Sequence, residues 1–190
     1  TDTYVGESAS YRAAKDIEDR IKIRHANGNN FQDSELKGVE EYVIECSILK
    51  VAVSEEMQNV ADEGIQVFGG MGFSAETPME GAWRDCRIGR IYEGTNEINR
   101  MLSVGMLIKK AMKGHLDIIT PATNVGKELM EIPSFEVPDL TELFAQEKLI
   151  IKNLKKIFLM LAGAGIQKYG EKLEEHQQML LNVSDVLIEV

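Results

Sequence analysis

Several residue types are scarce in this sequence, and each scarcity excludes a class of protein. Only Cys46 and Cys86 occur among the 190 residues, far apart and in no spacing typical of a metal or redox site. We therefore expect reduced thiols in a cytosolic type of compartment. The 3 histidines are equally scattered, so no metal site is predicted.

The sequence also lacks a long apolar run and an excess of basic residues. No stretch reaches the ~18 uninterrupted apolar residues that a membrane span requires, and no targeting segment is recognisable. The net charge is -10, from 21 basic and 31 acidic residues. Because such a surface repels a phosphate backbone, nucleic acid is not an expected partner.

An initiating methionine is missing too, and the chain ends at Val190, directly after an apolar run. We expect both ends to continue in a longer protein. A site within these residues would then be incomplete.

What the sequence does contain is helix-forming residues at helical spacing. Leu, Met, Glu, Lys and Ala are abundant, whereas prolines and aromatic residues are few. Apolar residues recur every three or four positions over 6–24, 34–68 and 140–161, and further helices are predicted over 95–113 and from 171 to the end. The predicted class is all-α, with long helices in an antiparallel bundle followed by a further helical region.

Glycine and proline mark where these helices are interrupted. The helix over 34–68 is expected to stop at Gly69-Gly70. Residues 71–92 are expected to be irregular, with at most a short helix over 79–84. Three prolines and little periodicity mark the next interruption. The predicted organisation is a helical domain at 1–114, a linker at 115–138 and an additional helical region at 139–190.

The residue with the strongest chemical signal is Glu93, which lies where an irregular segment meets the start of a predicted helix. Free backbone amides at a helix N-terminus bind anionic oxygens, and Thr95 adds a hydroxyl there. A carboxylate in such a loop suits a general base. The simpler interpretation is that Gly94 or Thr95 caps the helix and that Glu93 interacts with the helix dipole.

Two further groups of residues have open interpretations. Gly69, Gly70 and Gly72 either let a ligand approach the backbone or only end a helix in a tight turn. They do not form a dinucleotide fingerprint, because no strand precedes them and the spacing differs. The second group consists of three arginines, Arg84, Arg87 and Arg90. They either contact phosphates or pair with acids such as Glu80 and Asp85.

The order and spacing of these segments resemble the acyl-CoA dehydrogenases. The resemblance rests on the runs Ala61–Phe73, Trp83–Asp85 and Arg90–Ile98, and it covers roughly residues 6–112. Residues 139–190 resemble the extra helical region of longer members, such as the very-long-chain type. The implied fold is the C-terminal helical domain of the family, truncated at its N-terminal side.

The resemblance implies a role for each matching residue. Glu93 falls on the base that removes the α-proton of a fatty acyl-CoA while the β-hydride passes to FAD. Gly94 falls on a substrate contact. Contacts to FAD fall on a group at the helix start: Thr95, Asn96 and Glu97. A second group falls on a loop that approaches the FAD of a neighbouring subunit: Gln66, Val67, Phe68, Gly69 and Gly70.

The resemblance also implies partners and a location. Electrons would pass to an electron-transfer flavoprotein, and the protein would be a homodimer or a dimer of dimers. The expected location is the cytoplasm in a bacterium and the matrix side of mitochondria in a eukaryote. The apolar stretch 154–166 either rests on a membrane surface or is a buried helix.

Two other functions remain open: a non-catalytic scaffold relative and an acyl-CoA oxidase. Because the family's N-terminal and middle domains are not in the chain, the fragment alone is expected to be inactive.

Overall fold

The structure, a computed structural model, describes residues 2–131 and 141–190. These residues are helical and no strand occurs among them, so the predicted all-α fold is confirmed. The helices are α1 (Asp2–Ala26), α2 (Phe31–Glu41), α3 (Val43–Phe68), α4 (Pro78–Ile88), α5 (Asn96–Met112), α6 (Ile119–Glu128), α7 (Ala145–Tyr169) and α8 (Gln177–Ile188), with 3-10 segments η1 (Gly69–Phe73) and η2 (Gly170–Glu175).

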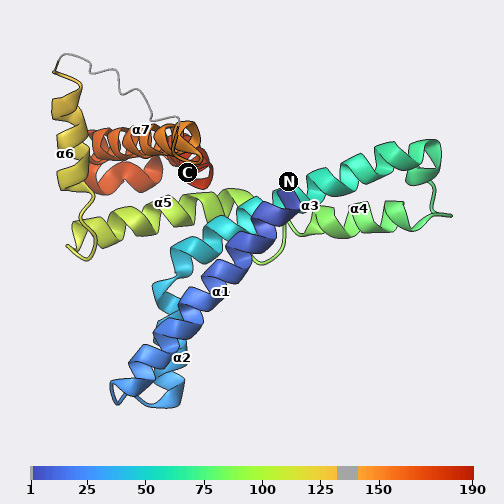
Figure 1. Cartoon of the computed structure of the whole chain (residues 1–190), viewed down its shortest axis with the longest axis horizontal. Coiled ribbons are helices and arrows are strands. Elements are labelled where there is room, and N and C mark those ends of the chain that lie inside the picture. Colours follow the sequence, from blue (N-terminus) through green and yellow to red (C-terminus); the bar gives the residue numbers. More distant parts are fainter. Residues whose placement is uncertain (1, 132–140) are drawn as a thin grey trace. The chain divides into compact units, whose positions relative to one another are not determined.

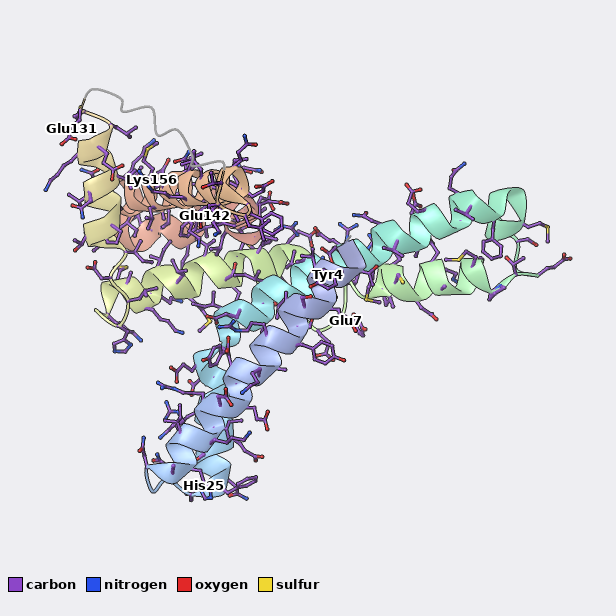
Figure 2. All side chains as sticks on the ribbon, in the orientation of Figure 1. Tyr4, Glu7, His25, Glu131, Glu142 and Lys156 are labelled. Carbon is purple, nitrogen blue, oxygen red and sulfur yellow. The ribbon has the colours of Figure 1, made fainter. Side chains whose placement is uncertain are left out.

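The chain forms two compact units, one ending at Ser103 and the other beginning at Val104. In the first unit α1 lies beside α2 and α3, and α4 returns beside α3 (Figure 1). In the second unit α7 lies beside α6 and α8. Lys156 of α7, labelled in Figure 2, pairs with Glu128 of α6 at 2.5 Å. The predicted domain boundaries at residues 114 and 138 stay a prediction.

Close packing joins α3 to α4 in the first unit. A Cβ on Gly64 would lie 2.6 Å from Met79 Cε, so the glycine lets the two helices approach. Trp83 of α4 donates from Nε1 to Asp62 of α3 at 3.1 Å. This hairpin supports the loop that follows α4.

The prediction of a single helix over 34–68 is wrong, because the chain leaves the helical conformation at Tyr42. The φ and ψ angles of Tyr42 are -101° and 19°, and its N–H donates to the Val39 carbonyl in a tight turn. No glycine or proline stands there to reveal the break. Glu41 at this point pairs with Arg20 and Arg24 of α1 at 2.6 and 3.5 Å, so tertiary contacts hold the end of α2.

Two segments are more helical than predicted. The short helix expected over 79–84 extends over Pro78–Ile88, with proline at its first turn. The predicted linker contains α6, where Pro121 lies in the first turn and therefore blocks no helical hydrogen bond. A proline taken as a helix breaker thus stands at a helix start. Residues 132–138 of that linker lie outside the described residues.

The end of the chain also differs in detail. Leu140, where the predicted helix begins, lies outside the described residues, and α7 starts at Ala145. The last helix does not begin at residue 171, because η2 precedes α8. The ring centroids of Tyr169 and His176 lie 3.7 Å apart across this segment, with the rings tilted by 36°, and this contact joins its two ends.

The apolar stretch 154–166 lies in α7 and is buried on one side. Phe158 and Ala162 are buried, whereas Ile157 and Met160 are 44% and 39% exposed. Among the helices that the structure describes, none combines the length and apolarity needed to cross a membrane.

Candidate active site

The loop between α4 and α5 makes a strained turn at Glu93. The φ angles of Glu93 and Gly94 are 58° and 84°, so two consecutive residues are left-handed. Glycine adopts this conformation readily, whereas a residue with a Cβ is uncommon there. A Cβ on Gly94 would also lie 3.0 Å from Asn99 Nδ2. The turn therefore requires Gly94, and it holds Glu93 in a conformation that clusters at functional sites.

Thr95 caps the N-terminus of α5. The backbone N–H of Ile98 donates to Thr95 Oγ1 at 3.3 Å. Glu97, in the first turn, accepts hydrogen bonds from its own backbone N–H and from the Thr95 hydroxyl, and these lower the pKa of its carboxyl. The predicted helix start is confirmed, and the capping interpretation holds for Thr95.

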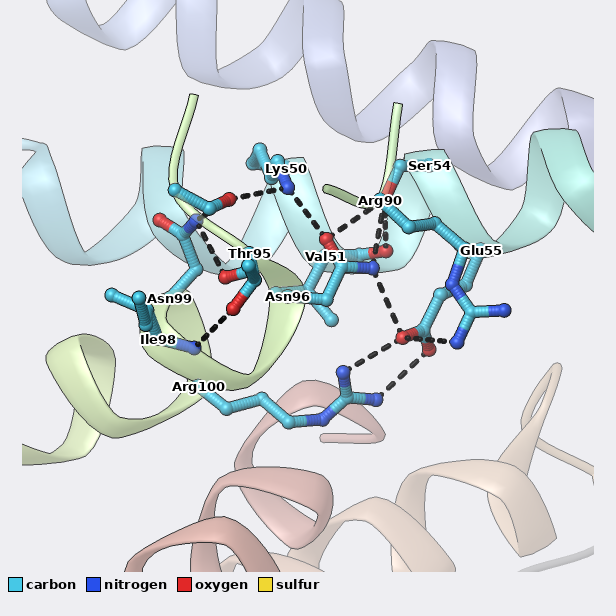
Figure 3. A network of polar contacts seen from close by, with 11 residues as sticks. Lys50, Val51, Ser54, Glu55, Arg90, Thr95, Asn96, Ile98, Asn99 and Arg100 are labelled. Carbon is cyan, nitrogen blue, oxygen red and sulfur yellow. Dashed lines mark hydrogen bonds and ion pairs between the residues drawn. The ribbon is translucent and has the colours of Figure 1, made fainter. Parts of the chain in front are cut away.

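Asn96 is 1% exposed and joins α5 to α3 (Figure 3). Its Nδ2 donates to Ser54 Oγ and Glu55 Oε1, both at 3.0 Å. Its Oδ1 accepts from Lys50 Nζ at 2.7 Å, and its backbone N–H donates to the Arg90 carbonyl at 3.1 Å. Because these polar atoms have partners within the chain, the contact of Asn96 with FAD stays a prediction.

The Glu55 carboxylate forms ion pairs with two arginines beside the start of α5. Arg100 donates to both of its carboxylate oxygens, at 2.7 and 2.9 Å, and Arg90 lies 3.6 Å away. The Arg100 hydrogen bonds are the main cause that lowers the pKa of the Glu55 carboxyl, against the opposing effect of burial. This pair ties α5 to α3.

The pairing interpretation of the arginines is correct for two of the three. Arg84 pairs with Glu80 at 3.2 Å, as predicted. Arg90 instead pairs with Glu55, which local spacing could not reveal. Arg90 lies in the loop that leads to the Glu93 turn, so its pair with Glu55 fixes this loop to α3.

Sequence reasoning did not single out Lys50. Its Nζ donates to the Gly94 carbonyl at 2.7 Å (Figure 3). Burial lowers the pKa of its ammonium, while the carboxylates of Glu97, Glu55 and Glu93 act in the opposite direction. Its partners lie more than 40 positions away in the sequence. The only signal of its role that the sequence carries is a charged residue among the apolar residues of a predicted helix.

The second predicted group, Gln66 to Gly70, lies elsewhere in the first unit. α3 ends at Phe68, and Gly69 has a φ angle of 60° with its N–H donating to the Gln66 carbonyl, so the predicted stop is confirmed. Val67 is 82% exposed and Phe68 51%. Gln66 lies about 24 Å further along α3 than Lys50, which contacts the Glu93 turn. One copy of the chain therefore does not bring the two groups together.

Glu93 itself is exposed, and so are its neighbours Ile91 and Tyr92. A carboxylate on a turn held from two helices can accept a proton from a ligand docked against it. Within the described ranges, no cluster of three His, Cys, Asp or Glu side chains could hold a metal ion.

Comparison with known proteins gives matches along the chain. The family model described as acyl-CoA dehydrogenase, C-terminal domain, matches residues 5–106, and a second model of the same description matches residues 153–190. A probable acyl-CoA dehydrogenase of Bacillus subtilis (strain 168) is 41% identical over 187 residues, covering 98% of this chain and 31% of that protein. The very long-chain specific acyl-CoA dehydrogenase of Mus musculus mitochondria is 40% identical over 93 residues, covering 49% of this chain and 13% of that protein.

A solved structure is similar over nearly the same span. The crystal structure of an acyl-CoA dehydrogenase complexed with FAD from Bacillus anthracis has a TM-score of 0.89 and 40% identity, covering 98% of this chain and 32% of that one. The chain thus spans about a third of the length of these two Bacillus relatives.

Proposed function

Because this chain belongs to the acyl-CoA dehydrogenase family, we propose that it forms the C-terminal helical part of an FAD-dependent enzyme that oxidises a fatty acyl-CoA to the enoyl-CoA. In this proposal the Glu93 carboxylate takes the α-proton of the thioester. FAD, when bound, supplies the acceptor for the β-hydride. The Glu93 backbone N–H stabilises the negative charge that develops on the thioester oxygen.

The observation that carries the proposal is the conformation of Glu93. It is one of two residues other than glycine with a positive φ angle in the described part of the chain. Nothing in helix capping needs a carboxylate at that position, since Thr95 caps α5. A strained, exposed carboxylate on a braced turn favours a catalytic role over a scaffold.

The residues that the resemblance assigns to FAD are compatible with such a ligand. The N-terminus of α5, where Thr95 lies, suits anionic oxygens, whereas the Glu97 carboxylate can only accept hydrogen bonds from a ligand. A Cβ on Gly70 would meet nothing within 4 Å, so the packing of this chain does not require glycine there. Close approach of another group would account for it.

The distance between the two groups of residues supports a site shared by two copies. Thr95 lies beside the Glu93 turn, whereas Gln66 to Gly70 lie at the far end of α3. We infer that these latter residues contact the FAD of a neighbouring subunit, so that a homodimer, or a dimer of dimers, completes each site. The reduced enzyme would pass its electrons to an electron-transfer flavoprotein.

The test uses the complete enzyme, meaning a protein of the relatives' length that contains these residues. Anaerobic mixing with saturated acyl-CoAs of several chain lengths is expected to bleach the oxidised flavin band with formation of enoyl-CoA. Absence of bleaching with every length would support a scaffold instead. Rapid reoxidation in air with release of hydrogen peroxide would identify an oxidase.

A second prediction concerns the 190-residue chain by itself. It is expected to purify without stoichiometric FAD and to form no enoyl-CoA, because Glu93 and its apolar neighbours are exposed. Absorbance of the purified chain, with and without added FAD, measures this. Stoichiometric flavin in the chain would contradict the prediction.

A further inference from the structure

The Glu93 turn is held in place through the carbonyl of Gly94. Two side chains donate to that oxygen: Lys50 Nζ at 2.7 Å and Asn99 Nδ2 at 2.8 Å. Asn99 belongs to α5, which begins directly after the turn, so its bond is local. Lys50 comes from α3, and its bond fixes the turn to a separate helix.

Lys50 holds the start of α5 at the same time. Its Nζ donates to Asn96 Oδ1 at 2.7 Å, and the rest of the Asn96 amide binds Ser54 and Glu55 on α3. One ammonium group of α3 therefore binds both the turn and the first residue of the helix that follows it. A shift of either bond would move the backbone that carries the Glu93 side chain.

Charge adds to this geometry. The carboxylates that act on Lys50 are those of Glu97, Glu55 and Glu93, whereas Arg90 and Arg100 neutralise Glu55 from its other side. Lys50 is thus a cation on α3 on which the carboxylate of the proposed base acts together with those of Glu97 and Glu55.

We propose that Lys50 is a positioning residue for the reaction, which fixes the left-handed turn at Glu93 and Gly94 so that the Glu93 carboxylate meets the α-carbon of the substrate. This inference rests on the proposed function, in which Glu93 is the base. Lys50 acts through Gly94 and needs no contact with substrate.

The test is Lys50→Met in the complete enzyme, which keeps an unbranched apolar side chain and removes the donor. The rate of flavin reduction by acyl-CoA is expected to fall about 10- to 100-fold, because a small misplacement of the base has effects of this size. Binding of the enoyl-CoA product, followed by perturbation of the flavin spectrum, is expected to stay unchanged. Lys50→Arg is expected to recover most of the rate, since it returns a charged donor.

A substrate analogue isolates the proton step. A thioester with sulfur in place of the β-methylene has no β-hydride to lose, so exchange of its α-protons in deuterium oxide reports deprotonation alone. Lys50→Met is expected to slow this exchange by the same factor as flavin reduction. Lys37→Met, which removes an exposed lysine of α2, is the matched control and is expected to change neither rate.

The outcomes separate the two proposals. If flavin reduction in Lys50→Met proceeds at the parental rate, Lys50 is not a positioning residue. The same conclusion follows if Lys50→Arg is as slow as Lys50→Met and both variants bind the enoyl-CoA product more weakly than the parent. If Glu93→Gln reduces flavin at the parental rate, the proposed function fails whatever Lys50 does. Should Lys50→Met not fold, Lys50→Gln gives the same comparison: a slowed reaction supports the inference and a parental rate overturns it.

Discussion

Glu93→Gln in the complete enzyme is expected to keep its flavin and to lose reduction by acyl-CoA about 10²- to 10⁴-fold, the usual contribution of a positioned general base. The substitution keeps the shape of the side chain and its left-handed backbone, so the turn is expected to survive. What it removes is the group that accepts the α-proton. Stopped-flow absorbance of the flavin band measures the rate.

Two further variants control for structure. Glu40→Gln, on the exposed side of α2, removes the same charge away from the site and is expected to reduce flavin at the parental rate. Glu93→Gly is expected to be inactive yet to unfold within about 1 kcal/mol of the parent, because glycine adopts a φ angle of 58° without the Cβ penalty. Reduction at the parental rate in Glu93→Gln would show that another group takes the proton.

Glu55→Ala is expected to lower the free energy of unfolding by about 2–4 kcal/mol near neutral pH, because it removes the carboxylate from a partly buried ion pair with Arg100. Arg100 would lose both of its bonds to Glu55, and Asn96 would lose one acceptor. Urea-induced unfolding of the 190-residue chain, followed by circular dichroism, measures the change.

The pH dependence of this loss follows from the pKa of the Glu55 carboxyl. That pKa lies below the ordinary value of 4.5 in the folded chain, so the stabilisation is fully present above about 4.5 and is lost as pH falls through the lower folded value. The difference between Glu55→Ala and the parent is therefore expected to shrink in acid.

Glu63→Ala is the matched control for Glu55→Ala. Glu63 is exposed on the same helix, and its replacement is expected to change stability by no more than about 0.5 kcal/mol. Equal stability of the two variants would show that the pair with Arg100 contributes nothing.

The sequence by itself determined the features that depend on neighbouring residues. It predicted the all-helical class, the end of α3 at Gly69 and the start of α5 at Thr95. It also placed Glu93 at a junction before a helix. Apolar periodicity, a capping hydroxyl and a glycine with a positive φ angle act within one or two helical turns, so spacing alone reveals them.

Only the tertiary structure decided the contacts between distant helices. Lys50 and Glu55 reach the start of α5 across more than 40 residues, and the break at Tyr42 coincides with ion pairs to α1. The left-handed conformation of Glu93 could not be predicted from the sequence either, because glutamate rarely adopts it. Such contacts depend on how whole helices pack against one another, and no local pattern encodes which turn of one helix faces which turn of the next.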